Sequence, residues 1–204
     1  MVYRDTRRAH RALFATAVAQ GGYITAVQAR KAGYDYPHLD YHVRAGNIER
    51  IGHGLYRLTQ IPPSEHDDLI RLSLWSRNRQ DQPQAVVSHE TALALHELSD
   101  VLPQRIHLTV PRSFRKRPPD KCILHKAPLA SSETEERPGF RATSPLRTLL
   151  DVAVGQLSQE QLDRAVAEAL DRGLLRRSSL LGAVESRPQA CRLSLCPALS
   201  HNPH

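Results

Sequence analysis

The sequence predicts an α+β protein, in which an N-terminal winged helix-turn-helix is followed by a mixed α+β domain. Three observations lead to this prediction. Glycine turns separate three short helical segments near the N-terminus, a glycine-folded hairpin follows the third segment, and capped helices then alternate with short apolar strands. The order of these elements is more specific than any one of them, because three helices and a hairpin in this order make up a winged helix.

The first two helices are bounded by turn and cap residues. The first helix is expected to begin at residue 5 or 6 and to end at residue 20, before two glycines. After a short extended segment, Thr25 can cap a second helix over residues 26–32, and Gly33 closes that helix in a tight turn.

The third helix has a buried stripe and an outward polar face. Asp35 is placed to cap it, and Pro37 suits its first turn, where the missing N–H costs nothing. Leu39 and Val43 lie four residues apart and should be buried together. The same spacing turns a polar, basic and aromatic set outward: His38, Tyr41, His42 and Arg44.

A hairpin is expected directly after this helix. Apolar and polar residues alternate over residues 48–52, the chain folds at Gly52-His53-Gly54, and residues 55–58 return. The glycines supply the positive φ that such a turn needs. In a winged helix-turn-helix the third helix enters the DNA major groove, and the hairpin forms a wing along the phosphate backbone.

Positive charge and tyrosine are concentrated in this same region. The 204 residues carry a formal net charge of +7, and residues 1–60 hold nine Lys/Arg against four Asp/Glu, a net charge of +5. All six tyrosines also lie within the first 56 residues. The combination favours a polyanionic partner for the N-terminal region, and a merely solvated basic face is the open alternative.

Nine side chains are therefore candidate DNA contacts. The outward face of the third helix would meet base edges or adjacent phosphates, and the wing and second helix would add sequence-independent phosphate contacts. Packing against the wing is the alternative role for Tyr41, and an internal ion pair is the alternative for Arg50. The nine candidates are Arg30, Lys31, His38, Tyr41, His42, Arg44, Arg50, His53 and Arg57.

Pro62 and Pro63 mark the expected domain boundary, because two prolines interrupt both strand and helix. The prediction is a winged-helix domain over residues 1–60 and an α+β domain over residues 64–186. Residues 187–204 have no clear hydrophobic period and end in polar and proline residues, so we expect a poorly ordered tail.

The second domain should alternate short strands with capped helices. Strands are expected at residues 85–87, 106–110 and 122–124, and a basic loop over residues 112–121 joins the last two. Helices should begin at serines that can act as N-caps, namely Ser64, Ser88, Ser144, Ser158 and Ser178 or Ser179. The acidic residues that precede the last three helices resemble a solvated loop: Glu133, Glu135 and Glu136.

Patterns for catalysis, metals and membranes are absent from the sequence or incomplete. Three cysteines make no disulfide framework, and no apolar run approaches the roughly 18 residues that span a bilayer, so we expect a cytoplasmic protein. His89 and His96 are seven residues apart, whereas a zinc helix needs two histidines four apart. No P-loop or nucleophile motif occurs. We therefore expect neither a metal, nor a cofactor, nor an enzyme.

Three stretches resemble one known family. Residues 21–58, GGYITAVQARKAGYDYPHLDYHVRAGNIERIGHGLYRL, resemble the N-terminal winged-helix domain of AbiEi-type antitoxins, which are the antitoxin half of type IV toxin–antitoxin systems. The stretches SHETALALHELSDVLPQRIHLTVP and TSPLRTLLDVA resemble the C-terminal domain of that family. The resemblance spans about residues 8–185, and the tail from Arg187 departs from the pattern.

This resemblance implies two functions and an abortive-infection setting. The N-terminal domain would bind double-stranded DNA of its own promoter, at inverted repeats, and repress the operon. The C-terminal domain would counter a co-expressed nucleotidyltransferase-like toxin, indirectly rather than through a stable complex. The residues alone support a basic winged helix joined to an α+β domain without an evident active site.

Two alternatives from other functional classes stay open. The chain could be a winged-helix transcriptional regulator whose C-terminal domain senses a ligand or dimerises. It could instead be a DNA-acting nuclease, although Pro119-Asp120-Lys121 is not followed by the Glu-x-Lys that would complete such a site. A toxin gene next door would favour the antitoxin, and cleavage of DNA with Mg²⁺ would favour the nuclease.

Overall fold

The computed structural model describes residues 6–100, 103–155, 157–186 and Leu195. Contacts between Cα atoms divide the chain into two compact units, Met1–Gln84 with Arg137–Phe140, and Ala85–Glu136 with Arg141–His204. Helices and a sheet occur in each, so the predicted α+β class is confirmed. The tail that was expected to be poorly ordered lies outside the described residues, apart from Leu195.

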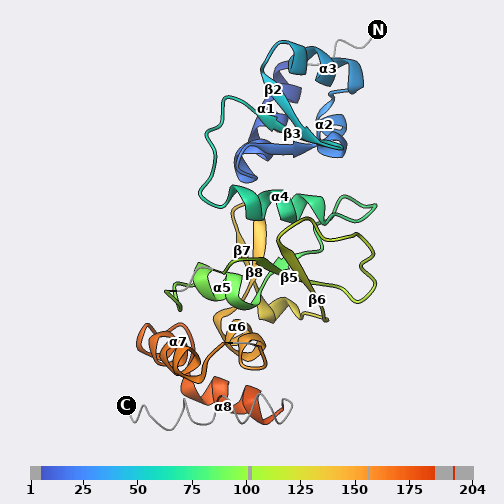
Figure 1. Ribbon diagram of the computed structural model, residues 1–204. Helices are drawn as coiled ribbons and strands as arrows, with labels where there is room; N and C mark the ends of the chain where they lie inside the picture. Colours follow the sequence, from blue (N-terminus) through green and yellow to red (C-terminus); the bar gives the residue numbers. More distant parts are fainter. Residues whose placement is uncertain (1–5, 101–102, 156, 187–194, 196–204) are drawn as a thin grey trace. The chain divides into compact units, whose positions relative to one another are not determined.

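The first unit begins as a winged helix-turn-helix (Figure 1). Its elements are α1 (Thr6–Ala19), β1 (Tyr23–Thr25), α2 (Ala26–Ala32), α3 (Tyr36–Arg44), β2 (Ile48–Gly52), β3 (Leu55–Leu58) and α4 (Asp67–Trp75). The three strands are antiparallel in the order β1-β3-β2. Three helices followed by the β2–β3 hairpin confirm the predicted winged helix, and β1 adds a third strand where only a short extended segment was expected.

Apolar side chains from α1, α3 and the sheet form the core of this unit. Leu13 of α1, Ile24 of β1 and Leu39 of α3 are each at most 2% exposed. Full burial of one such aliphatic side chain stabilises the fold by about 1.5–3 kcal/mol. Leu39 is thus buried as predicted, and the half-buried Val43 packs against the same cluster. Burial of this stripe leaves the opposite face of α3 in solvent.

Helix α4 also packs in the first unit, although the sequence suggested a new domain from residue 64. A Cβ atom on Gly21, whose φ is 60°, would lie 2.7 Å from the Ile70 Cδ1, so α4 closely approaches the turn after α1. The Tyr23 hydroxyl also donates to the Asp67 carboxylate. The compact unit therefore continues through Gln84. That the functions separate at the two prolines stays a prediction.

The second unit is built on a mixed five-stranded sheet in the order β6-β5-β4-β8-β7. Strand β4 pairs antiparallel with β5 and parallel with β8, and β5 pairs parallel with β6. Its elements are β4 (Val86–Val87), α5 (His89–Leu95), β5 (Ile106–Val110), β6 (Cys122–Lys126), the 3₁₀ turn η1 (Ser131–Glu133), β7 (Thr134–Arg137), β8 (Phe140–Thr143), α6 (Pro145–Val152), α7 (Gln159–Asp171) and α8 (Arg177–Glu185).

The helices of this unit share one apolar core (Figure 1). Leu93 of α5, Leu149 of α6, Val166 of α7 and Leu180 of α8 are each at most 1% exposed. The predicted N-cap at Ser144 accepts from the Arg147 N–H, and Ser158 and Gln161 form the predicted capping box.

The acidic segment before α6 is not the solvated loop that the sequence suggested. Residues Thr134–Arg137 form β7, an edge strand, which explains why an apolar alternation is missing from it. Glu133 accepts from the buried Arg147 at 2.8 Å, and Arg147 also donates to Asp151 at 2.8 Å. The sequence does not reveal that Arg147 is 7% exposed. A buried guanidinium requires such carboxylate partners.

Candidate nucleic-acid interface

Local hydrogen bonds and turn geometry fix both ends of α2 and the start of α3. Thr25 and Gln28 form a reciprocal capping box at the start of α2, and Gly33 ends that helix with a left-handed φ of 104°. The Asp35 carboxylate then accepts from the His38 N–H at 3.0 Å and caps α3. Because each of these signals lies within a few residues, all three were recognisable in the sequence.

The outward face of α3 presents an aromatic and a cationic side chain to solvent. Tyr41 is 66% exposed, so packing against the wing is not its role in this structure. Arg44 forms an exposed ion pair with Asp40 one turn earlier, with Nη2 and Oδ2 2.7 Å apart. Exposed pairs of this kind contribute about 0.3–0.5 kcal/mol, so a DNA phosphate or base can replace Asp40 at little cost.

The two histidines of α3 differ in their surroundings. His38 is exposed and its Nδ1 lies 3.0 Å from Asp35. His42 is half-buried, because its ring packs against Tyr34 at 5.5 Å between ring centroids and lies edge-on to Tyr41 at 5.3 Å. Burial, followed by the nearby His10 and His38, lowers the pKa of His42. A neutral His42 is suited to a hydrogen bond with a base rather than to a phosphate contact.

The exposed polar side chains of the wing include Arg50 and His53. The β2–β3 pairing places Arg50 opposite Tyr56 and ends in a turn where Gly54 has a φ of 65°. Among the described residues, Arg50 has no hydrogen-bond or ion-pair partner for its side chain. The ion pair with Glu49 or Asp40 that was the alternative for Arg50 is therefore not formed in this structure.

Arg57 has an internal role that the sequence did not suggest. Its Nη2 donates to the Ile61 carbonyl at 2.8 Å, and its Cζ lies 6.0 Å from the centroid of the Tyr23 ring. The side chain is half-buried on β3. Of the nine candidates, Arg57 is thus the one whose guanidinium is most clearly used to hold the unit together.

The last turn of α2 adds cations and reveals a further aromatic residue. Arg30 and Lys31 are both exposed, and the Arg30 Cζ lies 5.8 Å from the ring centroid of Tyr36. Tyr36, at the start of α3, is 59% exposed and was not among the candidates. An exposed tyrosine stacked on an arginine is a suitable surface for a sugar–phosphate backbone. The concentration of tyrosine in this region was the sequence signal for it.

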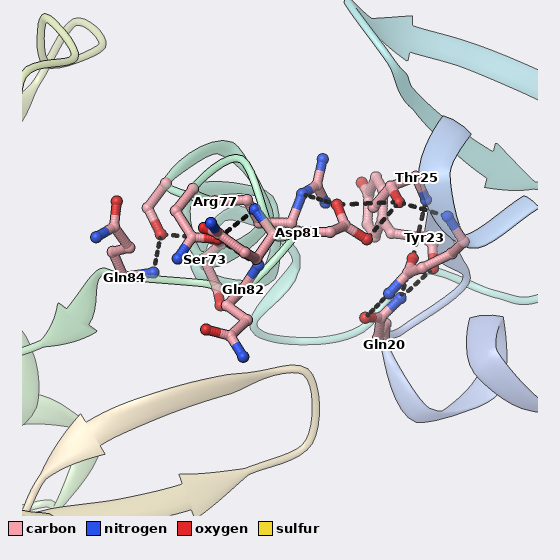
Figure 2. Close-up of polar contacts among 12 residues, drawn as sticks. Gln20, Tyr23, Thr25, Ser73, Arg77, Asp81, Gln82 and Gln84 are labelled. Atoms are coloured by element: carbon pink, nitrogen blue, oxygen red, sulfur yellow. Dashed lines mark hydrogen bonds and ion pairs between the residues drawn. The ribbon is translucent and has the colours of Figure 1, made fainter. Parts of the chain in front are cut away.

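A buried polar network outside the winged helix braces α2. The Asp81 carboxylate accepts from the Thr25 hydroxyl at 3.1 Å and from the Arg77 Nε at 2.9 Å, and these side chains lie in a row in Figure 2. The same Thr25 oxygen accepts from the Gln28 N–H at 3.0 Å. Because Asp81 fixes the hydroxyl that caps α2, residues after the wing help to set the geometry of the helix-turn-helix.

Comparison with known proteins gives one family match. The model of the family described as "Transcriptional regulator, AbiEi antitoxin" matches residues 11–59. Residues 11–59 match the AbiEi antitoxin family. The match covers residues 11–19 of α1 and continues through the wing, and it confirms the predicted resemblance for the N-terminal domain. The description of that family is of a transcriptional regulator of the antitoxin type. No curated protein matches the chain.

A solved structure shares the fold of the chain over almost its whole length. The crystal structure of the RV2827C protein from Mycobacterium tuberculosis aligns with a TM-score of 0.59 and 17% sequence identity. The alignment covers 95% of this chain and 76% of that chain. At this identity the likeness concerns the fold alone. Within the described residues, no helix is both long and apolar enough to cross a membrane.

Proposed function

We propose that this chain is a cytoplasmic DNA-binding antitoxin of a type IV toxin–antitoxin system. Its winged helix represses the operon by binding inverted repeats in its own promoter, and its second unit counters a nucleotidyltransferase-like toxin without a stable complex. The AbiEi antitoxin match over residues 11–59 supports this proposal. The second function rests on the resemblance of the later stretches to the same family.

The observation that carries the DNA-binding part is the exposure of cationic and aromatic side chains on α3 and on the wing. Tyr41 and Arg44 project from a helix whose other face is buried, and Arg50 lies on the following hairpin without a partner among the described residues. In our proposal α3 reads base edges in the major groove. Arg50, His53, Arg30 and Lys31 contact phosphates, and Arg57 stabilises the unit.

Binding to a labelled promoter fragment tests the first function. Tyr41→Ala or Arg44→Ala should weaken binding by about 1–3 kcal/mol if the side chain reads a base, and should relax the preference at one base pair. Arg79→Ala is the matched control, because Arg79 is an exposed arginine in the loop after α4. If all three variants bind like the wild-type chain, α3 is not the recognition helix.

Growth with an inducible toxin tests the second function. The full chain with Arg44→Ala and Arg50→Ala should lose promoter repression and still protect cells. Leu149→Asp places a charge in a core position that is 0% exposed, so it should remove protection. Loss of protection in the double arginine variant would mean that the two functions do not separate. No protection by the wild-type chain would exclude the antitoxin assignment and leave the regulator alternative.

A further inference from the structure

A cluster of three histidines and one glutamate lies in the second unit, outside the winged helix. His89 and Glu90 begin α5, whereas His107 and His125 come from the neighbouring strands β5 and β6. The rings of His89 and His125 stack with centroids 3.5 Å apart and planes inclined by 13°. The His107 Nδ1 lies 2.7 Å from the Glu90 Oε2 and 3.2 Å from the His125 Nε2.

The ionisation of Glu90, His89 and His125 follows from burial and from their close contacts. Glu90 is ionised at neutral pH, because its hydrogen bond with His107 lowers the pKa of the carboxyl to about 2. Burial lowers the pKa of His89 to about 3, with His125 adding to the effect, and burial also lowers the pKa of His125. The cluster therefore places an ionised Glu90 carboxylate close to two neutral imidazoles, those of His89 and His125.

The carboxylate of Glu90 has acceptor capacity left over. Among the described residues, His107 is its one side-chain partner, and a carboxylate has two oxygens with about four lone-pair sites. The Glu90 side chain is 25% exposed and that of His107 is 14% exposed. An ionised carboxylate that is this far removed from water, with unused acceptor sites, is a strong recognition element for a donor group.

A cavity of about 250 Å³ opens directly onto this pair. Four apolar side chains form most of its wall, namely Leu93, Pro103, Ile123 and Leu157, and Glu90 and His107 supply polar groups. Arg105 and Gln104 are exposed and complete the rim with Ser99. A concave, mostly apolar site with a few convergent polar groups is the usual form of a small-molecule site.

We infer that this cavity binds a small organic cation, an amine or amidine with an apolar body, and that Glu90 recognises the cationic group. The apolar wall would cover the body of the ligand while the Glu90 carboxylate accepts from its N–H groups. The cavity volume suits a ligand of one ring rather than a drug-sized molecule, whose pockets begin at about 300 Å³. The inference does not depend on the DNA-binding proposal, since every residue in it lies in the second unit.

A metal ion explains this cluster less well than an organic cation. Among the described residues, no group of three or more His, Cys, Asp or Glu side chains could hold a metal ion. The parallel stacking of His89 on His125 is one reason, because the nitrogen lone pairs of two parallel rings cannot converge on one ion. His96, which the sequence placed with His89, lies elsewhere, with its Nε2 2.8 Å from the Thr143 carbonyl oxygen.

Two probes that differ only in the group offered to Glu90 test the inference on the full chain. Benzamidine is a planar cation with donor N–H groups on both sides, and benzamide has nearly the same shape but is neutral and replaces one donor side by a carbonyl. We expect saturable binding of benzamidine in calorimetry, and binding of benzamide weaker by about 10-fold or more, because charge-assisted hydrogen bonds are about twice as strong as neutral ones. In NMR spectra, benzamidine should shift the signals of His107 and Ile123.

Two charge-removing variants complete the experiment. Glu90→Gln keeps the size of the side chain and should reduce benzamidine binding by about 10- to 100-fold. Glu185→Gln, at an exposed position of α8, should leave it unchanged. Each of three results would overturn the inference: equal affinity for the two probes, an equal loss of benzamidine binding in the two variants, or no binding of benzamidine at about 10 mM. A dissociation constant of 10 mM is roughly the weakest affinity that such a contact would give. If Glu90→Gln does not fold, the probe comparison and the NMR shifts of the wild-type chain decide.

Discussion

Replacing Asp81 by asparagine should strongly destabilise the first unit, although Asp81 lies outside the winged helix. The Asp81 side chain is 8% exposed and that of its partner Arg77 is 13% exposed, so the substitution leaves a buried guanidinium without its counter-charge. Burial already lowers the pKa of Arg77, and Asp81 opposes that effect. Asparagine also tolerates the positive φ of 66° at this position, so the change isolates the charge from the backbone.

The magnitude follows from the two hydrogen bonds that Asp81 accepts. Removing one partner of a buried ion pair costs about 3–5 kcal/mol, but the amide oxygen of asparagine can still accept from the Arg77 Nε. We therefore expect a loss of about 2–3 kcal/mol in the free energy of unfolding. Trp75 is the single tryptophan of the chain and lies on α4 in the same unit. Urea denaturation followed by tryptophan fluorescence is thus a direct measurement.

Asp68→Asn is the matched control for this prediction. It makes the same chemical change in an exposed pair, in which Asp68 and the Arg71 Nη1 are 3.5 Å apart, and should cost less than about 0.5 kcal/mol. Promoter binding provides a second readout. Because Asp81 acts through the Thr25 cap and not on DNA, Asp81→Asn should lower affinity without changing the salt dependence. Similar losses of stability in the two variants would refute the reasoning.

Three further predictions follow from the charges of the two units. Arg50→Ala should reduce the slope of log K against log salt by about one unit in promoter binding, and an unchanged slope would mean that Arg50 contacts no phosphate. Because burial holds the pKa of folded His89 near 3, below its unfolded value of about 6.5, the unfolded chain binds more protons between these values. Stability of the second unit should therefore fall as the pH drops through this range, and His89→Asn should flatten the curve measured by circular dichroism. Arg147→Met leaves Glu133 and Asp151 without their buried partner and should cost about 3–5 kcal/mol in urea denaturation, and a loss below 1 kcal/mol would show that the two acids do not depend on it.

The sequence alone determined the helix-turn-helix, because its signals act over a few residues. Thr25 before α2, Asp35 before α3, and Ser158 with Gln161 cap their helices in the structure as predicted. Each cap satisfies N–H groups within the next three positions, so no distant residue is needed to recognise it. The family resemblance was recognisable for the same reason, since it rests on contiguous stretches.

Only the tertiary structure decided how charged and polar residues far apart in the sequence are used. His107 and His125 become neighbours because β5 and β6 pair in parallel, a register that no local pattern specifies. Arg57 looked like one more exposed cation of the wing until the fold half-buried it against Tyr23 of β1. The fold likewise brings Asp81 to the Thr25 hydroxyl. Burial makes the difference: a charge in water has many equivalent partners, whereas a charge removed from water depends on the few groups that the fold brings to it.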